Sequence, residues 1–294
     1  MMFEINRTAL NQSIRAWLEE DIGMGDVTTM TTIPEESQST GIIHVKDTGF
    51  VAGLAVAEAV FAIVDPELRF EVKATEGQAV QVGTVLAEVH GATRSILLGE
   101  RLALNLLQRM SGIATRTRQF VDKLDGLPTR LVDTRKTTPG HRMLEKYAVR
   151  VGGGHNHRYG LYDAVMIKDN HIKGAGGITQ AIRSARANIP HTMKIEIEVE
   201  NFEQLEEALA AGPDIVMLDN MKPEQMRQAV QRMKSEAPHI LIEASGMVSL
   251  DTVRAIAETG VDVISVGRLT YSVQALDISL DLNERKSAGE AGRA

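Results

Sequence analysis

Charged residues recur at the ends of short apolar runs in the second half of the chain, where their types and spacing could do chemistry. Arg135 and Lys136 come soon after the run RLV, Lys168 follows AVMI, Asp219 follows IVML, and Glu198 lies inside the run IEIEVE. In a barrel of alternating strands and helices, the loops at the carboxyl ends of the strands converge on one mouth, where the active site lies. We therefore expect these side chains to face a single cavity.

The cations of this set predict a pocket for a polyanionic small molecule. Arginine binds carboxylates and phosphates through a bidentate fork, and lysine binds them as a compact point charge. The formal net charge of the chain is -7, but residues 130–173 are rich in Lys, Arg and His, so basic groups are concentrated where the pocket is expected. The side chains that we expect to bind carboxylates or phosphates are Arg135, Lys136, His157, Arg158 and Lys168.

Two carboxylates and two glycines complete the expected pocket. Glu198 and Asp219 suit ribose hydroxyls or a magnesium ion, because Mg²⁺ prefers a few carboxylates together with substrate oxygens. Gly246 and Gly267 follow the next two apolar runs, and backbone N–H groups at such glycines can approach a terminal phosphate. These residues therefore suit a ligand that carries ribose hydroxyls and phosphate or pyrophosphate groups.

The elements that must position these residues alternate between strands and helices. Short apolar runs, each followed by a segment with helical spacing, are separated by about one βα unit. Asn201, Pro223 and Ser249 lie where helices should begin, and Gly212 and Gly260 lie where two should end. Parallel strands with right-handed crossovers follow from this pattern, and about six or seven such units in series favour a barrel over an open sheet.

The first half of the chain has a different pattern. Residues 40–90 contain short strand-like runs between glycines and charged residues, and residues 95–124 have helical spacing with Gly112 as a possible break. The segment EGQAVQVGTVLAEV is similar to a half-barrel of lipoyl carrier domains, but it lacks the lysine that such a carrier displays. We therefore expect a β-sandwich shape here without a carrier role.

Composition excludes several classes of function. The chain has 294 residues, is 43% hydrophobic and contains no Cys, which excludes disulfides, thiolate metal sites and a cysteine nucleophile, and suits a reducing cytoplasm. The negative net charge argues against a nucleic-acid partner. Residues 1–21 include charged positions and no long apolar core, so we expect a soluble, cytoplasmic protein with neither a signal peptide nor a membrane span.

Motifs along nearly the whole chain resemble those of the quinolinate phosphoribosyltransferase family, also called nicotinate-nucleotide pyrophosphorylase (carboxylating). The most specific are DTRKTTPG and GGGHNHRYGL taken together. The others are EDIGMGDVTT, GERLALNLLQRMSGIAT, KYAVRV, MIKDNH, IEIEVEN, VMLDN, EASG, ISVG and YSVQALDISL.

This resemblance implies an α/β protein of two domains. The first is an N-terminal α/β sandwich over residues 1–112, which the C-terminal segment 274–294 joins. The second, over residues 113–273, is an open, incomplete βα-barrel of about seven strands that carries the catalytic site. The resemblance also implies a homodimer with shared active sites, and leaves a higher oligomer open.

The resemblance also implies a role for each site residue. Arg101, from the GER motif, is expected to reach the active site of the partner subunit. The residues implied to surround quinolinate are Thr134, Arg135, Lys136, His157, Arg158 and Lys168. Glu198 and Asp219 are implied to hold the ribose end of phosphoribosyl pyrophosphate and Mg²⁺, the ion being bound through water or substrate oxygens. The catalytic residues implied are Lys136, Lys168, Glu198 and Asp219.

Two turns are implied to hold the 5-phosphate of the sugar. They consist of Gly246, Met247, Val248, Gly267, Arg268 and Leu269. Met247 and Arg268 are not the residues most expected at these positions. His44, His90, His191 and His239 lie outside all of these motifs and are expected to be structural or on the surface.

The implied reaction transfers the phosphoribosyl group to quinolinate with loss of CO2, and gives nicotinate mononucleotide and pyrophosphate for NAD biosynthesis. Three alternatives stay open. A related enzyme could use nicotinate or another pyridine or pyrimidine without decarboxylation. A Schiff-base aldolase could use Lys168, since a lysine at a barrel strand end is a common imine-forming residue. A non-enzymatic protein could bind the sugar phosphate without turning it over.

Overall fold

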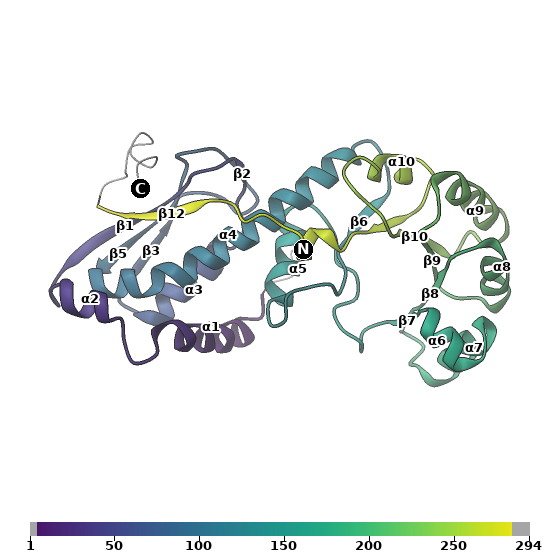
Figure 1. Ribbon diagram of the computed structural model, residues 1–294, viewed down its shortest axis with the longest axis horizontal. Helices are drawn as coiled ribbons and strands as arrows, with labels where there is room; N and C mark the ends of the chain where they lie inside the picture. Colours follow the sequence, from purple (N-terminus) through teal and green to yellow (C-terminus); the bar gives the residue numbers. More distant parts are fainter. Residues whose placement is uncertain (1–4, 284–294) are drawn as a thin grey trace. The chain divides into compact units, whose positions relative to one another are not determined.

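The computed structural model describes residues 5–283 and consists of two units (Figure 1). The first unit combines Met1–Arg116, Thr138–Gly152 and Ser272–Ala294, and the second combines Thr117–Thr137 and Gly153–Tyr271. Residues 1–4 and 284–294, which include the end of the expected segment 274–294, lie outside the described residues. The chain thus leaves the first unit twice and returns to it after Tyr271.

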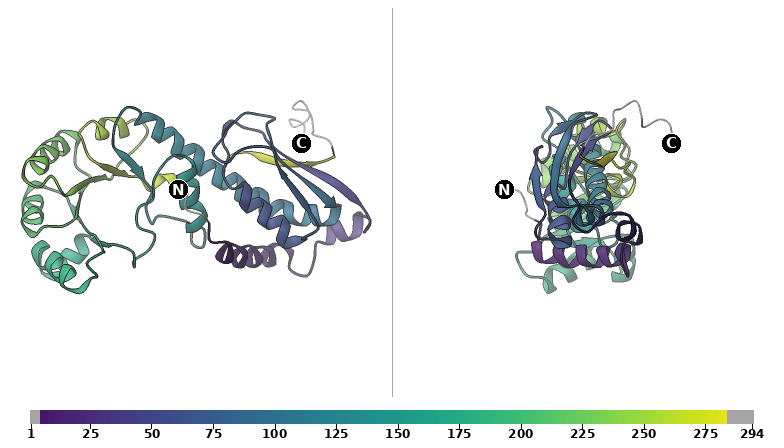
Figure 2. Two further views of the ribbon diagram at one scale, coloured as in Figure 1. Left: turned by 180° about the vertical axis from the view of Figure 1, so that it is seen from behind. Right: turned by 90° about the vertical axis from the view of Figure 1, so that its left-hand side faces the viewer.

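An antiparallel sheet of four strands forms the framework of the first unit. The strand order is β12 (Ile278–Leu282), β1 (Gln38–Val45), β5 (Val85–Ala92) and β3 (Arg69–Val72). Two helices, α3 (Leu54–Val64) and α4 (Thr93–Lys123), lie along this sheet (Figure 2). Fully buried residues of the sheet and helices form the core, among them Ile43, Phe61, Leu86 and Ile96.

Smaller elements complete the described part of the first unit. They are α1 (Arg7–Ile22), α2 (Val27–Thr32), α5 (Arg142–Val151) and the two-stranded pair of β2 (Gly49–Phe50) and β4 (Ala79–Val80).

The chain returning from the second unit is fastened to α4. Leu276 N–H donates to the carbonyl oxygen of Gln108 over 3.0 Å, and the Gln108 side chain donates to the carbonyl oxygen of Ile278 over 2.7 Å. A Cβ atom at Gly112 would collide with the Gln274 carbonyl oxygen. Helix α4 runs without interruption through Gly112, so the break expected there is wrong, and the glycine instead allows the returning chain to approach the helix closely.

Helix α3 begins without a capping side chain of its own, because its N-cap residue is Gly53. The Glu76 carboxylate takes that role from a neighbouring loop. It accepts hydrogen bonds from Gly53 N–H over 2.6 Å and from Leu54 N–H over 3.2 Å. Amide groups at a helix start have no partner within the helix, so a carboxylate there stabilises it.

Replacing Glu76 with alanine is therefore expected to lower the free energy of unfolding by about 1–2 kcal/mol, as the loss of an N-cap does. Chemical denaturation of the wild type and of Glu76→Ala measures this difference. Glu67→Ala, at an exposed position after the same helix, is the control and should change stability by less than about 0.5 kcal/mol. Equal stability of the two variants would contradict the capping role.

The second unit is an open, incomplete barrel. Six parallel strands pair in the order β6 (Arg130–Val132), β11 (Val263–Ser265), β10 (Leu241–Ser245), β9 (Ile215–Asp219), β8 (Ile195–Val199) and β7 (Val165–Ile167). A single parallel bridge between Val132 and His155 adds a short extended segment beside β6. The fold class expected from the sequence is confirmed. The parallel sheet contains six strands, whereas about seven were expected.

Helices connect these strands and cover the outside of the sheet (Figure 2). They are α6 (Asp169–Ala175), α7 (Ile178–Asn188), α8 (Phe202–Ala211), α9 (Pro223–Glu236) and α10 (Val253–Ala257). The short helix α11 (Arg268–Tyr271) follows the last of the strands, β11. In β8, Ile195, Ile197 and Val199 are fully buried, while Glu196 and Glu198 alternate with them and share the opposite, inner side. Within residues 5–283, no helix combines the length and the apolar character that crossing a bilayer requires.

Candidate active site

A cavity of about 560 Å³ opens at the carboxyl ends of the second unit's strands. The sequence predicts the active site at this end of the barrel, and most of the expected site residues line the cavity. These are Thr134, Lys136, Lys168, Glu198, Asp219, Gly246, Met247, Val248, Gly267 and Arg268. Other residues of the wall are Asn220, Ser245, Ser249, Ser265, Val266 and Tyr271.

A second cavity, of about 600 Å³, lies around the end of α4 and the start of β6. Its wall includes Thr129 and Arg130, at the amino end of a strand, and the ion pair of Arg118 with Asp122, 2.7 Å apart. In barrels of this type, the amino ends of the strands serve stability and the carboxyl ends serve chemistry. We therefore take the cavity at the carboxyl ends as the candidate active site.

Lysine and carboxylate groups meet on one wall of this cavity. Lys168 Nζ lies 2.7 Å from Glu198 Oε2. Glu198, Glu200 and Asp219 each offer a carboxylate oxygen, and these atoms all lie within 4.8 Å of one another. Burial raises the pKa of Asp219, and the nearby charge of Glu198 raises it further. Like charges held this close favour a cation between them, so the three carboxylates fit a Mg²⁺ ion that also binds substrate oxygens.

The loops after β10 and β11 form another part of the cavity wall. Gly246 has φ 89° and Met247 has φ 48°, so two consecutive residues adopt the left-handed conformation, which favours glycine. Met247 therefore adopts a backbone conformation that favours glycine, and it is 79% exposed. After β11, a Cβ atom at Gly267 would come within 2.9 Å of the Lys136 side chain, so the absence of a side chain there lets the two loops meet.

Arg135 and Arg158 lie close enough to each other to interact. Burial lowers the pKa of Arg158, and the positive charge of Arg135 lowers it further. The Arg158 guanidinium also donates to the carbonyl oxygen of Ala164 over 2.9 Å. Two guanidinium groups that repel each other form a suitable site for a dianion, whose binding would relieve that repulsion.

His157 is directed toward the barrel interior. Its Nε2 atom lies 3.1 Å from Glu196 Oε2 and 3.5 Å from Glu243 Oε2. Burial alone would lower the pKa of His157, but its hydrogen bonds and charge interactions with the two glutamates outweigh burial and raise the pKa to about 10. The Arg158 N–H group donates to Nδ1 over 2.7 Å, which favours a neutral ring. An Nδ1 atom that accepts this bond carries no proton, so the geometry describes a ring that donates from Nε2 toward the two glutamates.

Five expected site residues do not line the cavity wall. Three of them, Arg135, His157 and Arg158, are described above. Leu269 is fully buried in α11, so its side chain packs in the core of the second unit. Arg101 is an exposed residue of α4 in the first unit.

Ser265 and Glu243 were not among the expected site residues. Ser265 ends β11 and lines the cavity wall. Glu243, the second partner of His157, stands in the run ILIEAS. The sequence did contain a signal for Glu243, because it is a glutamate inside an otherwise apolar strand. Such a residue is buried only when it has a partner.

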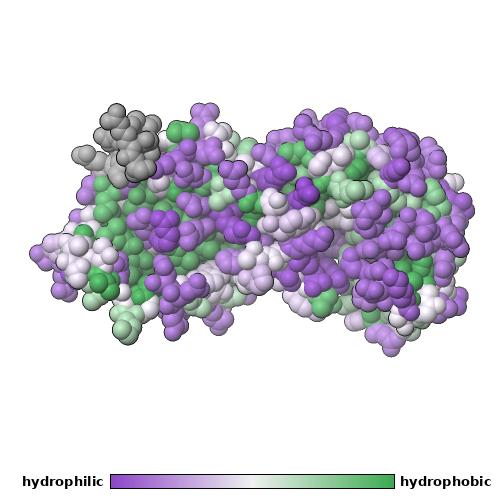
Figure 3. All heavy atoms as spheres, viewed as in Figure 1, coloured by the Kyte–Doolittle hydropathy of each residue, from purple (hydrophilic) through white to green (hydrophobic). Residues whose placement is uncertain are grey.

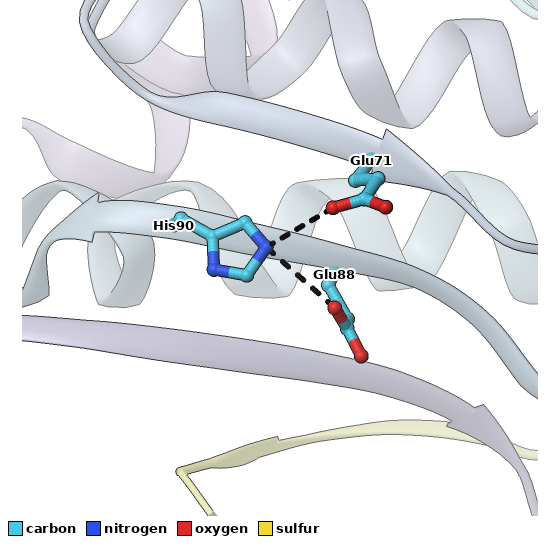
Figure 4. A group of neighbouring side chains, drawn as sticks. All are labelled: Glu71, Glu88 and His90. Carbon is cyan, nitrogen blue, oxygen red and sulfur yellow. Dashed lines mark ion pairs between the residues drawn. The ribbon is translucent and has the colours of Figure 1, made fainter.

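His90 belongs to a cluster on the sheet of the first unit (Figure 4). Its Nε2 atom lies 3.7 Å from Glu71 and 3.6 Å from Glu88. The Lys73 ammonium lies 2.7 Å from Glu71 and 3.2 Å from Glu88. Because a lysine already compensates both carboxylates, we interpret this group as a structural ion-pair cluster. His44 is likewise paired with Asp281, 2.9 Å away.

Comparison with known proteins identifies the family of this chain. A family model described as "Quinolinate phosphoribosyl transferase, C-terminal domain" matches residues 113–281, and the corresponding N-terminal domain model matches residues 26–111. A probable nicotinate-nucleotide pyrophosphorylase (carboxylating) of Synechocystis is 48% identical over 276 residues, which cover 92% of this chain and 91% of that protein. The Bacillus subtilis protein of the same description is 45% identical, with 95% of each chain covered.

Solved structures show the same likeness. The crystal structure of NadC from Streptococcus pyogenes superposes with a TM-score of 0.90 at 40% identity, and covers 96% of this chain and 99% of that one. A nicotinate-nucleotide pyrophosphorylase from Francisella tularensis also has a TM-score of 0.90, at 38% identity. The chain therefore belongs to the quinolinate phosphoribosyltransferase family.

Proposed function

We propose that this chain transfers the phosphoribosyl group of phosphoribosyl pyrophosphate to quinolinate and releases pyrophosphate and CO2, giving nicotinate mononucleotide. The observation that carries the proposal is the cavity at the carboxyl ends of the barrel strands, where two lysines and an arginine line the wall together with Glu198 and Asp219. These two carboxylates belong to the group of three described above. Relatives 41–42% identical to this chain are described as quinolinate phosphoribosyltransferase (decarboxylating). The nicotinate mononucleotide formed in this reaction would be a precursor for NAD biosynthesis.

Quinolinate is a dicarboxylate, and the basic side chains suit it. Arg135 and Arg158 would bind its two carboxylates. Lys136, the residue after Arg135, lines the cavity together with Lys168. Thr134, whose hydroxyl accepts from Lys136 N–H over 3.0 Å, holds the start of the Arg135–Lys136 turn. These residues orient the pyridine ring and screen its repulsion from the phosphates of the second substrate.

Phosphoribosyl pyrophosphate would occupy the other part of the cavity. Glu198 and Asp219 would hold Mg²⁺ and the ribose hydroxyls, while the turns at Gly246 and Gly267 would receive the 5-phosphate through backbone N–H groups. When bound, Mg²⁺ would neutralise the charge that develops on the departing pyrophosphate. Lys168, 2.7 Å from Glu198, sits between the two substrate regions and can balance charge on both.

The chemistry needs no protein nucleophile. The pyridine nitrogen attacks the anomeric carbon, a C–N bond forms and the C–O bond to pyrophosphate breaks. The alkylated ring is cationic, so it accepts the electron pair when the bond to the adjacent carboxylate breaks and CO2 leaves. The ring carbon then takes a proton from solvent. The protein contributes position and electrostatic stabilisation, which suits a site rich in charge.

An assay of both substrates tests this proposal. Purified protein with Mg²⁺ and phosphoribosyl pyrophosphate is given quinolinate in one reaction and nicotinate in another, and pyrophosphate, CO2 and mononucleotide are measured. We expect equal amounts of all three products from quinolinate only, and no turnover after Mg²⁺ is removed by chelation. Turnover of nicotinate without CO2 would assign the related activity, and turnover of neither would reject both.

A Schiff-base mechanism at Lys168 is less compatible with the geometry. An imine-forming lysine must lose its proton to become a nucleophile, whereas Lys168 forms an ion pair with Glu198. Borohydride would trap a protein-bound imine with carbonyl substrates if this alternative were correct.

We also propose a homodimer whose subunits share active sites, and a cytoplasmic location. The dimer is supported by the exposed position of Arg101 and by the surface of the first unit. On the face seen in Figure 3, hydrophobic residues gather over the first unit while the second is mostly hydrophilic. Extended apolar surface commonly marks a protein interface. The cytoplasmic location stays a prediction that rests on the absence of Cys.

A further inference from the structure

Three buried carboxylates lie beneath the candidate active site. Asp133 follows β6, Glu196 lies in β8 and Glu243 lies in β10. Their exposed fractions are 0%, 2% and 3%. In the sheet order these strands alternate with β11 and β9, and alternate strands of a barrel supply the side chains of one interior layer. An interior layer is normally filled by branched apolar residues, so three acids here are exceptional.

All three carboxylates contact one tripeptide, Asn156–His157–Arg158. Asp133 accepts hydrogen bonds from the Asn156 side chain over 2.6 Å and from His157 N–H over 2.9 Å. Glu196 and Glu243 both face His157 Nε2, at 3.1 and 3.5 Å. The acids therefore hold the main chain and the imidazole of this segment.

The tripeptide in turn holds Arg158. The Arg158 N–H group donates to His157 Nδ1 over 2.7 Å, and the guanidinium donates to the Ala164 carbonyl oxygen. Beyond it, Asp163 accepts from Tyr159 N–H over 2.6 Å and from Gly160 N–H over 2.8 Å, which closes the following loop. Since each ring nitrogen of His157 has a partner within the protein, the imidazole links the barrel interior to the backbone of Arg158.

Stability alone does not account for the two glutamates. Among the described residues, Oε1 of Glu196 and Oε1 of Glu243 are buried without a hydrogen-bond partner. Burying such oxygens costs free energy, and well-packed apolar side chains are often at least as stable as buried ion clusters. Their presence is better explained by what they hold in place.

We propose that Glu196 and Glu243 are positioning residues for quinolinate binding, which act through His157 to hold Arg158 where it meets a substrate carboxylate. This inference rests on the proposed function, and it assigns His157 to positioning in place of direct substrate contact. Neither glutamate touches the substrate. Their loss should therefore weaken quinolinate binding selectively, because phosphoribosyl pyrophosphate binds through other side chains.

The test uses Glu196→Gln and Glu243→Gln, which keep the side-chain shape and remove the charge. Binding of quinolinate alone and of phosphoribosyl pyrophosphate with Mg²⁺ is measured by calorimetry, together with KM and kcat. We expect the Kd and KM for quinolinate to rise about tenfold or more in each variant, as loss of a charge-assisted contact does. The affinity for phosphoribosyl pyrophosphate should change less than about twofold, which also shows that the variant is folded.

A double-mutant cycle shows whether the glutamates act through His157. If they do, Glu196→Gln should add little to the loss caused by His157→Gln, because both changes remove the same link. Glu206→Gln, which breaks an exposed ion pair with Arg232 on the outer helices, is the matched control and should bind quinolinate like the wild type. If Glu196→Gln does not fold, Glu243→Gln, with the longer contact, provides the same comparison.

Different experimental outcomes would contradict either the proposed function or the positioning role of the glutamates. Wild-type protein that does not bind quinolinate would reject the proposed function itself. Wild-type binding with unchanged quinolinate affinity in both glutamine variants would overturn the positioning role. Equal losses for both substrates, or fully additive losses in the His157→Gln background, would show a general structural role and would also overturn it.

Discussion

Lys168→Ala is expected to lower kcat/KM for quinolinate by about a hundredfold. The Lys168 ammonium lies 2.7 Å from Glu198. Burial raises the pKa of Asp219 and the charge of Glu198 raises it further, whereas the positive charge of Lys168 lowers it. Without the Lys168 ammonium, no lysine charge offsets the repulsion between Glu198 and Asp219, and the substrate anions lose a positive charge that would help to bind them. A charge-assisted contact contributes about 1.5–3 kcal/mol, and about 2.7 kcal/mol corresponds to a hundredfold change.

Steady-state kinetics with each substrate varied in turn measures this effect. Lys173→Ala is the matched control, because Lys173 lies five positions further on, is 73% exposed and pairs only with Asp169 on its own helix in the contacts described. It should keep activity within about twofold, as changes at exposed ion pairs do. If Lys168→Ala loses no more activity than Lys173→Ala, Lys168 does not belong to the catalytic machinery.

Arg101→Ala is expected to be nearly inactive alone, and to regain activity when mixed with Lys168→Ala subunits. If Arg101 completes the site of the partner subunit, a heterodimer of the two variants contains one site with both residues intact. Random exchange makes half of the dimers mixed, with one working site of two, so the mixture should reach about a quarter of wild-type activity. Subunits carrying different tags show that exchange has occurred.

The matched control is a mixture of Lys168→Ala with Asp219→Ala. These residues line the same cavity of one chain, so no combination of such subunits restores a complete site. Activity in this control would mean that the rescue has another cause. Failure of the Arg101→Ala mixture despite demonstrated exchange would place the whole site within one chain.

Local sequence signals predicted much of the barrel correctly. Asn201 caps α8 by accepting from Gln204 N–H over 2.9 Å, Pro223 opens α9, and Gly212 ends α8 with φ 70°. Ser249 does not begin a helix as expected. Its N–H group donates to the Thr252 hydroxyl over 2.9 Å, and α10 begins at Val253. Caps act through contacts within a few residues, so sequence predicts them well, but it does not separate a helix start from a turn of similar composition.

The site was harder to predict in detail, because its geometry depends on which strands become neighbours. In β8, Glu196 alternates with buried apolar residues, which puts it on the inner side of the strand. Only the order of the strands brings it near Glu243. The direction of the His157 ring follows from that pair. Likewise, residue type alone did not show that Met247 adopts a left-handed backbone, since that conformation is imposed by the loop around it.

The place of β12 in the first sheet has a consequence for how the chain is made. Strand β1 pairs with β12 along Gly41–Val45, yet β12 comes after the whole second unit in the sequence. At about 5–20 residues per second, a ribosome takes on the order of tens of seconds to pass from one strand to the other. Throughout that interval β1 presents an unpaired edge, which is a template for aggregation. The unit whose first strand emerges early is therefore completed last, and the edge of β1 stays unpaired while the whole second unit is synthesised.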